Sequence, residues 1–340
     1  MGQLRILSGK DLTMNQQLLI SILLFLVGFA CLIKGGDWFV DGATGIAHRF
    51  HLPELLIGAT IVSIGTTLPE VMVSSQAALV GNAGISYGNA IGSIICNTSL
   101  IAALTVAIRP GKVNPKSLIL PTAFFFLAAI FYAANAYITG TFTRPIGILF
   151  LLVFLVYMVL TVLHMKKHPE DAAEDAEEET KKEQPLWMEL LLLIVGATVI
   201  AIGADLLVDN GTVIAKALGV PDSVIGLTMV ALGTSLPELI TAITSLAKGH
   251  SALSLGNVIG ANLFNIVLVS GAAITISPFA VPTEKTIAGM NSSLLIDIPV
   301  MLGVMAILCL PALFRKKLSR VQGILLLAIY VTFTVYQFVS

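Results

Sequence analysis

The sequence predicts an all-α polytopic membrane protein with ten transmembrane helices in two inverted-topology five-helix repeats. Composition gives the first indication, because 56% of the 340 residues are hydrophobic, 11% are charged and the mean hydropathy is +0.93. A soluble chain of this length needs more charge to cover its surface. The second indication is a duplication, because residues 35–100 align without a gap with residues 203–268. The net charge of −1 gives no indication of nucleic-acid binding.

Ten apolar stretches reach the length of about 20 residues that a helix needs to cross a bilayer. The stretch that begins at position 18 resembles a secretory signal, but its counterpart lies in mid-chain, where no signal peptide could be. We therefore expect it to be a genuine span. The predicted spans are 18–48, 54–80, 87–108, 117–138, 145–165, 187–216, 222–247, 254–276, 292–314 and 321–338.

These spans divide the chain into an N-terminal tail (1–17), a first five-helix repeat (18–165), a charged linker (166–186) and a second five-helix repeat (187–340). The linker is expected to be solvated and mobile, with a regulatory helix or cation-sensing patch as the alternative. Loops after the odd-numbered spans carry most of the Lys and Arg, which predicts a cytoplasmic linker and two outward-facing termini. Because five is an odd number, the second repeat must enter the membrane from the opposite side.

The most informative motif is a proline-containing hexapeptide that occurs once in each repeat. It reads GTTLPE over 65–70 and GTSLPE over 233–238. Proline donates no backbone hydrogen bond and its ring clashes with the carbonyl four residues earlier, so each motif should break its helix and free a carbonyl. The expected helix-break residues are Gly65, Pro69, Gly233 and Pro237, beside the hydroxyls of Thr66, Thr67, Thr234 and Ser235.

Each hexapeptide ends in a glutamate, Glu70 or Glu238, which shares a helix face with the first hydroxyl of its motif. An ionised side chain at the bilayer centre costs at least about 2.5–3.5 kcal/mol on insertion scales. A neutral carboxylate hydrogen-bonded inside the bundle is one interpretation, but packing gives little reason for two equivalent ones. Carbonyls, hydroxyls and carboxylates together predict a site for a hard cation.

A second motif follows each hexapeptide, GNAIGSIICN from residue 88 and GNVIGANLFN from residue 256. Its last asparagines, Asn97 and Asn265, lie deep in apolar segments, and we expect them to be ligands, with interhelical hydrogen bonds as the alternative. Asn89 and Asn257 are expected at helix starts or behind the ligands. The glycines of the motif are expected to let helices approach closely.

A third duplicated pattern consists of acids near one end of the first and sixth spans: Asp37, Asp41, Asp205 and Asp209. We expect these to hydrate a helix end or to line an entry vestibule. The three cysteines and five histidines have no metal-ligand spacing. The sequence therefore predicts no cofactor.

Together these motifs resemble the two alpha repeats of the calcium:cation antiporter superfamily, and most closely the bacterial and archaeal sodium/calcium exchangers, including the YrbG-like exchangers. The similarity covers both repeats and, with the ten spans, nearly the whole chain. It implies an antiporter that exchanges calcium for sodium by alternating access through one site at the membrane midplane. It also implies a prokaryotic inner or plasma membrane, a functional monomer, and first and sixth helices that slide as a pair.

The resemblance further implies the ligands. Calcium would be held by Glu70, Glu238, Thr66 and Thr234. Sodium would be held by the main-chain carbonyls of Ser63 and Ala231 and by the side chains of Thr67, Ser93, Ser235, Asn97 and Asn265. The chain departs from many sodium-transporting members in having Ala261 in place of serine and Asn265 in place of aspartate. These changes weaken monovalent sites more than a divalent one, so the proton is the alternative counter-ion.

Two other classes of function compete with an antiporter. A cation channel would be expected to place rings of ligands in a symmetric oligomer rather than to build one pseudo-twofold site. An intramembrane enzyme would need a Ser/His pair at depth, or a Gly-x-Gly-Asp context around Asp37 and Asp205, and the sequence has neither. The sequence therefore predicts a transporter and no enzyme.

Overall fold

The structure is a computed structural model that describes residues 9–167, 184–218, 233–283, 286–287 and 289–339. Within these ranges nine helices are long and apolar enough to cross a membrane, and α11 (Leu236–Ala247) is a shorter apolar helix. α11 occupies the predicted seventh span, whose first half falls mostly outside the described residues, as do linker residues 168–183. The all-α polytopic fold is confirmed.

The elements of the first half, in chain order, are α1 (Gly9–Arg49), α2 (Glu54–Ile57), the π-helix η1 (Gly58–Val62), α3 (Ser63–Leu79), α4 (Ala83–Cys96), the π-helix η2 (Asn97–Ala102), α5 (Ala103–Ile108), α6 (Pro115–Thr139), β1 (Thr141–Phe142) and α7 (Arg144–Lys167). Those of the second half are α9 (Leu186–Ala217), α11, α12 (Ser251–Phe264), the π-helix η3 (Asn265–Ser270), α13 (Gly271–Ile276), β2 (Phe279–Ala280), β3 (Thr286–Ile287), β4 (Met290–Asn291), the π-helix η4 (Ser293–Asp297), α14 (Ile298–Arg315) and α15 (Arg320–Val339).

The duplication extends from the sequence to the secondary structure. The run α4–η2–α5 covers 83–108 and the run α12–η3–α13 covers 251–276, at the same offset that relates 35–100 to 203–268. The π-helices η2 and η3 begin at equivalent asparagines. The offset changes only after these runs, where the second half inserts the β3–β4 hairpin before η4 and α14.

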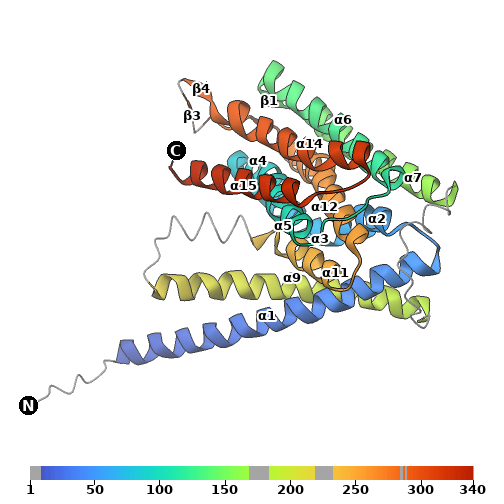
Figure 1. Cartoon of the computed structure of the whole chain (residues 1–340). Helices are drawn as coiled ribbons and strands as arrows, with labels where there is room; N and C mark the ends of the chain where they lie inside the picture. The colour runs from blue at the N-terminus through green and yellow to red at the C-terminus, as the bar shows by residue number, and fades with distance from the viewer. Residues whose placement is uncertain (1–8, 168–183, 219–232, 284–285, 288, 340) are drawn as a thin grey trace, which may run out of the picture.

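Helices α1 and α9 lie side by side along one flank of the molecule (Figure 1). Glycines let their backbones approach closely, since a Cβ added at Gly28 would lie 2.9 Å from the carbonyl oxygen of Gly203. A Cβ added at Gly35 would lie 3.0 Å from the carbonyl oxygen of Gly196. Gly28 matches Gly196 and Gly35 matches Gly203 in the duplication, so the two contacts are reciprocal, as across a two-fold axis.

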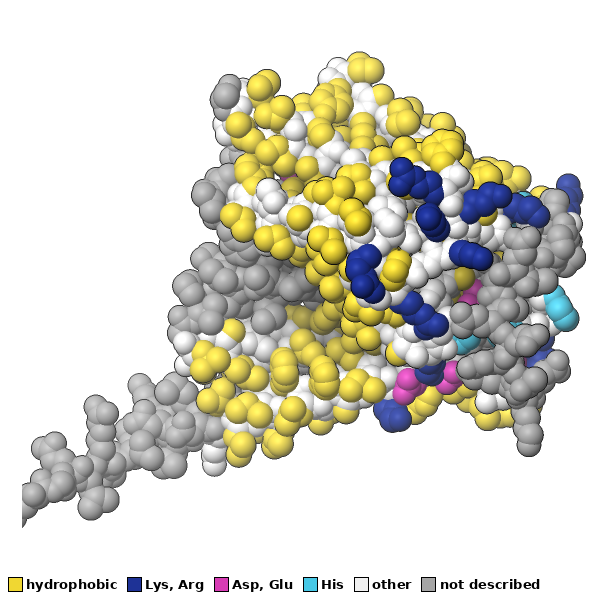
Figure 2. Space-filling view, in the orientation of Figure 1, with side chains coloured by type: hydrophobic (Ala, Val, Ile, Leu, Met, Phe, Trp, Pro, Cys, Tyr) yellow, Lys and Arg dark blue, Asp and Glu magenta, His cyan; other side chains and the backbone are white. Residues whose placement is uncertain are grey.

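The remaining helices form a bundle whose centre is the duplicated motif. The α12 run is the most buried span and the α4 run the next, whereas α1, α7, α9 and α15 expose much of their length. Those outer helices expose bulky apolar side chains such as Leu26, Leu155, Ile194 and Ile324. Hydrophobic side chains cover much of the face of the molecule that Figure 2 shows. Exposed apolar surface of this extent suits a lipid environment, and the chain is a membrane protein with several apolar helices.

Short strands join the ends of helices. β1 pairs antiparallel with β2, with Thr141 opposite Ala280, which ties the α6–α7 connection of the first half to the segment after α13. Asn135 in α6 donates to the carbonyl of Thr141 at 2.8 Å, and Gly140 ends α6 with a positive φ of 65°. These pairs close the bundle at one end without contributing to its centre.

Candidate functional site

The two proline motifs adopt different backbones. In the first half, α3 runs through Gly65 and Pro69 without ending, which differs from the expected break, because a single missing hydrogen bond opens a helix without terminating it. The irregular backbone lies one turn earlier, in η1. In the second half a turn at Thr234 and Ser235 precedes α11, and Pro237 occupies the first turn of that helix, where its missing N–H has no partner to lose.

Glu70 and Glu238 are both completely buried, with 0% of each side chain exposed. They come from opposite halves of the chain and lie near enough to interact electrostatically. Among the residues that the structure describes, none is a hydrogen-bond partner of their four carboxylate oxygens. Buried carboxylates without partners carry a large desolvation penalty, which a bound cation would offset.

Four further side chains complete this set, and they too come in duplicated pairs. Asn97 and Asn265 have both amide atoms buried without a partner. The hydroxyls of Thr67 and Ser235 are likewise buried and unpartnered. Native proteins leave few such groups unsatisfied, so the clustering of unsatisfied groups at duplicated positions points to a ligand.

The two asparagines are positioned by π-helices. Asn97 begins η2 and Asn265 begins η3, and these wider turns frequently occur at functional sites. η2 packs against α11, the helix of Glu238, whereas η3 packs against α3, the helix of Glu70. Each asparagine is therefore presented to the glutamate helix of the other half.

Hydrogen bonds between the two halves hold the hydroxyls that surround the glutamates. Each of these bonds has a counterpart at the equivalent positions of the duplication. Thr66 donates to Oδ1 of Asn257 at 3.1 Å, and Thr234 donates to Oδ1 of Asn89 at 3.2 Å. Asn89 in turn donates to the carbonyl of Glu70 at 3.1 Å. Asn89 and Asn257 thus stand behind the candidate ligands and orient them, as their position in the motif predicts.

The structure describes only some of the other predicted ligands. Ser63 donates to the carbonyl of Asn257 at 2.9 Å, which joins the halves at a buried position. Ser93 is buried in α4, three residues before the end of that helix and four before Asn97. Ala231, the counterpart of Ser63, lies outside the described residues. Thr66 and Thr67 lie near the Glu238 carboxylate, without a hydrogen bond of standard geometry.

The glycines of the second motif pack as expected in one copy. A methyl group on Gly256 would collide with the carbonyl of Leu55, and one on Gly260 with the hydroxyl of Ser63. Among the described residues, no atom lies within 4 Å of a Cβ added at Gly88 or at Gly92. The chain segment equivalent to Leu55–Ser63 is 223–231, which lies outside the described residues.

The duplicated aspartates show an asymmetry that sequence reasoning missed. Nζ of Lys248, in the turn between α11 and α12, lies 2.9 Å from Asp41 and 3.4 Å from Asp37. The position equivalent to Lys248 in the first half holds valine, so this tie has no duplicate. His250 and Glu54 also form a buried pair at 2.8 Å on this side of the bundle. The sequence signal that could have indicated this contact is a lysine in one half that can face an i, i+4 pair of acids in the other half.

The geometry describes an oxygen-lined centre with two formal negative charges. Among the described residues no group of three or more His, Cys, Asp and Glu could hold a metal ion, so neutral oxygens would have to complete the coordination. Hydroxyl, amide and carboxylate oxygens with no sulfur or imidazole suit Ca²⁺ or Na⁺ rather than a transition metal. The residues present therefore fit a hard cation.

Comparison with known proteins agrees with this chemistry. The family described as sodium/calcium exchanger protein matches residues 20–163 and 188–339. An uncharacterised membrane protein, MJ0091, of Methanocaldococcus jannaschii is 36% identical over 320 residues, covering 92% of this chain and 97% of that protein. The putative antiporter CaxA of Alkalimonas amylolytica is 33% identical, covering 95% of this chain and all of that one.

The same fold is found in solved structures. The sodium-calcium exchanger NCX_Mj superposes with a TM-score of 0.77 at 32% sequence identity, covering 93% of this chain and 98% of that one. The match spans both halves, and the family assignment covers all the residues of the oxygen-lined centre that the structure describes. The chain belongs to the sodium/calcium exchanger family.

Proposed function

We propose that this protein is a secondary active antiporter that exchanges Ca²⁺ for Na⁺ through the oxygen-lined centre. The observation that carries the proposal is the pair of fully buried, unpartnered glutamates, one from each half. Glu70 and Glu238 would hold Ca²⁺, with oxygens of Thr66 and Thr234. Na⁺ would use Thr67, Ser235, Asn97, Asn265 and Ser93, with the main-chain carbonyls of Ser63 and Ala231. The protein acts as a transporter and not as an enzyme.

Charge balance explains why transport would be coupled. Two carboxylates compensate one divalent cation or two monovalent cations, and either occupant leaves the buried centre near neutrality. Without a cation, moving this centre past the hydrophobic part of the protein would carry uncompensated charge through a medium of low dielectric constant. Reorientation of the unloaded protein is therefore slow, and each half-cycle requires an ion.

The fold supports alternating access. We propose that the α1–α9 pair slides along the rest of the bundle and uncovers the centre first on one side and then on the other. The two halves would be inserted in opposite orientations, which places equivalent paths on the two faces of the membrane. The reciprocal contacts between Gly28 and Gly203 and between Gly35 and Gly196 support this pseudo-twofold arrangement.

Calcium/proton exchange is a second candidate, and specific residues favour it. Asn265 supplies a neutral amide where an aspartate would add charge, and Ala261, which is completely buried, supplies no hydroxyl. A centre with fewer monovalent ligands returns more readily with protons on its two carboxylates, since two adjacent negative charges resist joint ionisation.

Transport in proteoliposomes distinguishes the two. The purified protein, loaded into vesicles with internal Na⁺, should accumulate Ca²⁺ when Na⁺ is absent outside and pH is equal on both sides. Uptake that needs a pH gradient and does not respond to Na⁺ would show that the counter-ion is the proton and not sodium. Uptake that persists with neither gradient would contradict exchange altogether.

We further propose that the protein works as a monomer in a prokaryotic inner or plasma membrane, with the linker in the cytoplasm and both termini outside. Lys and Arg side chains gather on one end of the bundle, over the loops that the sequence predicts to be cytoplasmic (Figure 2). Labelling of single cysteines in the α5–α6 and α14–α15 loops of intact cells tests this orientation. Reaction of these cysteines with a membrane-impermeant maleimide would show that the two loops face outward, opposite to the proposed orientation.

A further inference from the structure

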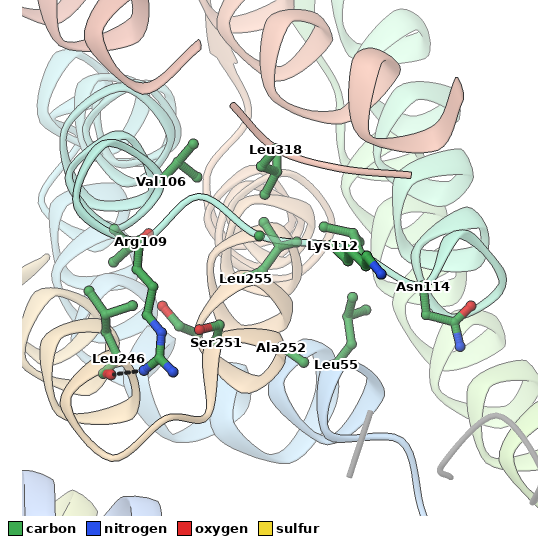
Figure 3. Close-up of a pocket in the computed structure, with 14 residues that line it drawn as sticks. Leu55, Val106, Arg109, Lys112, Asn114, Leu246, Ser251, Ala252, Leu255 and Leu318 are labelled. Carbon is green, nitrogen blue, oxygen red and sulfur yellow. Dashed lines mark hydrogen bonds between the residues drawn. The ribbon is translucent and has the colours of Figure 1, made fainter. Parts of the chain in front are cut away.

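A pocket lies between the two halves at the lysine-rich end of the bundle, away from the oxygen-lined centre (Figure 3). It encloses about 540 Å³ of empty space, including its open mouth. The first half contributes the loop 109–114 between α5 and α6, and the second half contributes the start of α12. The end of α11 and the loop before α15 close its sides through Leu246 and Leu318.

The polar side chains of this pocket are hydrogen-bond donors. Arg109 and Lys112 line it, and no acidic residue is among the described residues that do so. Arg109 reaches across the pocket wall and donates to the carbonyl of Leu246 at 3.3 Å (Figure 3), so its guanidinium is held next to Ser251. The pocket therefore has a positive charge that comes from two side chains of the 109–114 loop, one of which is held by a hydrogen bond to α11.

Two buried donors in this pocket have no partner. Ser254 is 2% exposed, and its hydroxyl makes no hydrogen bond. The amide nitrogen of Asn114 is also buried without a partner, because Asn114 uses its other amide atom, Oδ1, to accept from the backbone N–H of Lys116 at 3.0 Å. An acceptor supplied from outside the chain would satisfy both groups.

Two helix N-termini meet at the same place. α6 begins immediately after Asn114, and α12 begins at Ser251 with no side-chain cap from His250. The first turn of α12 lines the pocket, so this helix directs the positive end of its dipole and its first backbone N–H groups toward it, whereas Pro115 at the start of α6 has no N–H and that of Lys116 is bonded to Asn114. Anions are stabilised by this arrangement, and cations are not.

We propose that the pocket binds a phosphoryl anion. Arg109 and Lys112 would supply charge, and Ser254, Asn114 and the start of α12 would supply directed hydrogen bonds. Apolar side chains such as Leu255 and Leu318 line the rest of the pocket, so the ligand would carry an uncharged portion beside its phosphoryl oxygens. A phospholipid headgroup and a soluble phosphate compound share this chemistry.

The location gives such binding a structural consequence. The ligand would bridge the α5–α6 loop of one half and α12 of the other, and α12 carries Asn257 six residues after Ser251. It would hold the stationary bundle together without contact to the α1–α9 pair. Binding to the folded state alone raises the apparent melting temperature.

The test uses the full chain in nanodiscs of phosphatidylcholine. One arm adds inorganic phosphate, and the other replaces a fifth of the lipid by phosphatidylglycerol. We expect one arm to raise the melting temperature and to slow amide hydrogen exchange in 109–114 and 251–255. The double variant Arg109→Gln with Lys112→Gln should lose most of both effects, and Ser254→Ala should weaken them several-fold.

The matched control is Arg315→Gln with Lys317→Gln, which removes the same charge from the same face without touching the pocket. The control should respond as the wild type does. An equal loss in the control would show a diffuse surface effect and overturn the site. Absence of protection in both arms for the wild type would also overturn it. Ca²⁺ transport is not a readout here, so failure of the exchange proposal would leave this result intact.

Discussion

The glutamates at the centre differ from other buried acids of the chain in what surrounds them. Glu54 pairs with His250 and Glu189 pairs with Arg49 at 2.9 Å, so both have partners within the protein. Glu70 and Glu238 have none. Because no described residue pairs with these two carboxylates, removal of their charge should affect ion binding more than folding.

Glu70→Gln and Glu238→Gln should each reduce Ca²⁺ uptake at least hundredfold, while the protein remains inserted and monodisperse. The amide keeps the shape of the side chain but removes one of the two charges that balance the divalent ion. Calcium flux in proteoliposomes and size-exclusion chromatography give the two measurements. Asp205→Asn, at an exposed acid on α9, is the control and should transport normally. Unchanged Ca²⁺ affinity in both glutamate variants would contradict the assignment.

The second residue-level prediction concerns the counter-ion. The double change Ala261→Ser with Asn265→Asp adds one hydroxyl and one charge to the second half of the centre. We expect it to strengthen Na⁺ competition with Ca²⁺ by several-fold, because a third carboxylate and a further hydroxyl let the centre hold one more monovalent ion without uncompensated charge. Isothermal titration of Ca²⁺ at increasing Na⁺ measures this. An affinity for Na⁺ that stays the same or falls would show that these two positions do not limit sodium binding.

At the scale of elements, α1 and α9 form the flank that is proposed to move. Their shared surface is built from small residues, and a side chain at Gly28 would meet the backbone of the partner helix. Close backbone contact of this kind holds the two helices together, so that they can move along the bundle as one unit. The tie from Lys248 to Asp37 and Asp41 anchors one end of α1 to the turn before α12.

Gly28→Val should slow exchange tenfold or more with Ca²⁺ affinity changed less than twofold. The added side chain clashes at a helix crossing and costs about 1–3 kcal/mol in overpacking, but it lies away from the centre. Comparison of transport rate with equilibrium binding separates these effects. Gly303→Ala in α14, where no described atom lies within 4 Å of the new methyl group, should leave both unchanged. A parallel loss of binding in Gly28→Val would mean that the whole fold is disturbed.

Lys248→Gln should shift the position of α1. Lys248 and Asp41 are partly exposed, so the tie is worth up to about 1 kcal/mol, which corresponds to roughly a fivefold change in population. Spin labels on α1 and α15 report the shift as a change in their distance distribution. High salt should change the wild type in the same direction and the variant little. Identical distance distributions in the wild type and in Lys248→Gln would show that the tie does not determine the position of α1. Lys317→Gln serves as the charge control.

At the scale of the whole molecule, Ca²⁺ should act as a clamp between the halves. An ion that bridges Glu70 and Glu238 binds only the folded chain and adds about 2.7 kcal/mol to its stability at a hundred times the dissociation constant. The apparent melting temperature in detergent should therefore rise with Ca²⁺, and Na⁺ should reduce that rise by competition. Glu238→Gln should show no such rise. A Ca²⁺ effect that survives in this variant would place the ion elsewhere.

Much of this architecture can be predicted from the sequence because the bilayer sets a length and the duplication fixes equivalent positions. The predicted span 117–138 matches α6, and 187–216 matches α9, each to within a few residues. The π-helices η2 and η3 cannot be predicted in this way, because a single wide turn leaves the apolar pattern unchanged. The continuous helix through Pro69 was also unexpected, since the surrounding bundle decides whether a lost hydrogen bond ends a helix.

The candidate site is predictable only as a set of residue types. Thr66, Glu70 and Asn97 stand out because each recurs in the other half of the chain. The pairing of Thr66 with Asn257 and of Thr234 with Asn89 requires knowledge of how the halves face each other. The tie at Lys248 breaks the duplication, so comparison of the two copies hides it.

The crossed pairing of Thr66 with Asn257 and of Asn89 with Thr234 also affects how the protein is made. Translation delivers the first five helices to the membrane while their polar partners are still unsynthesised. Until the second half has been inserted, the Thr66 hydroxyl and Oδ1 of Asn89 lack these partners, although Nδ2 of Asn89 can already donate to the carbonyl of Glu70. The first five helices must therefore persist in the membrane with these two polar atoms unpaired until the ribosome has completed α12.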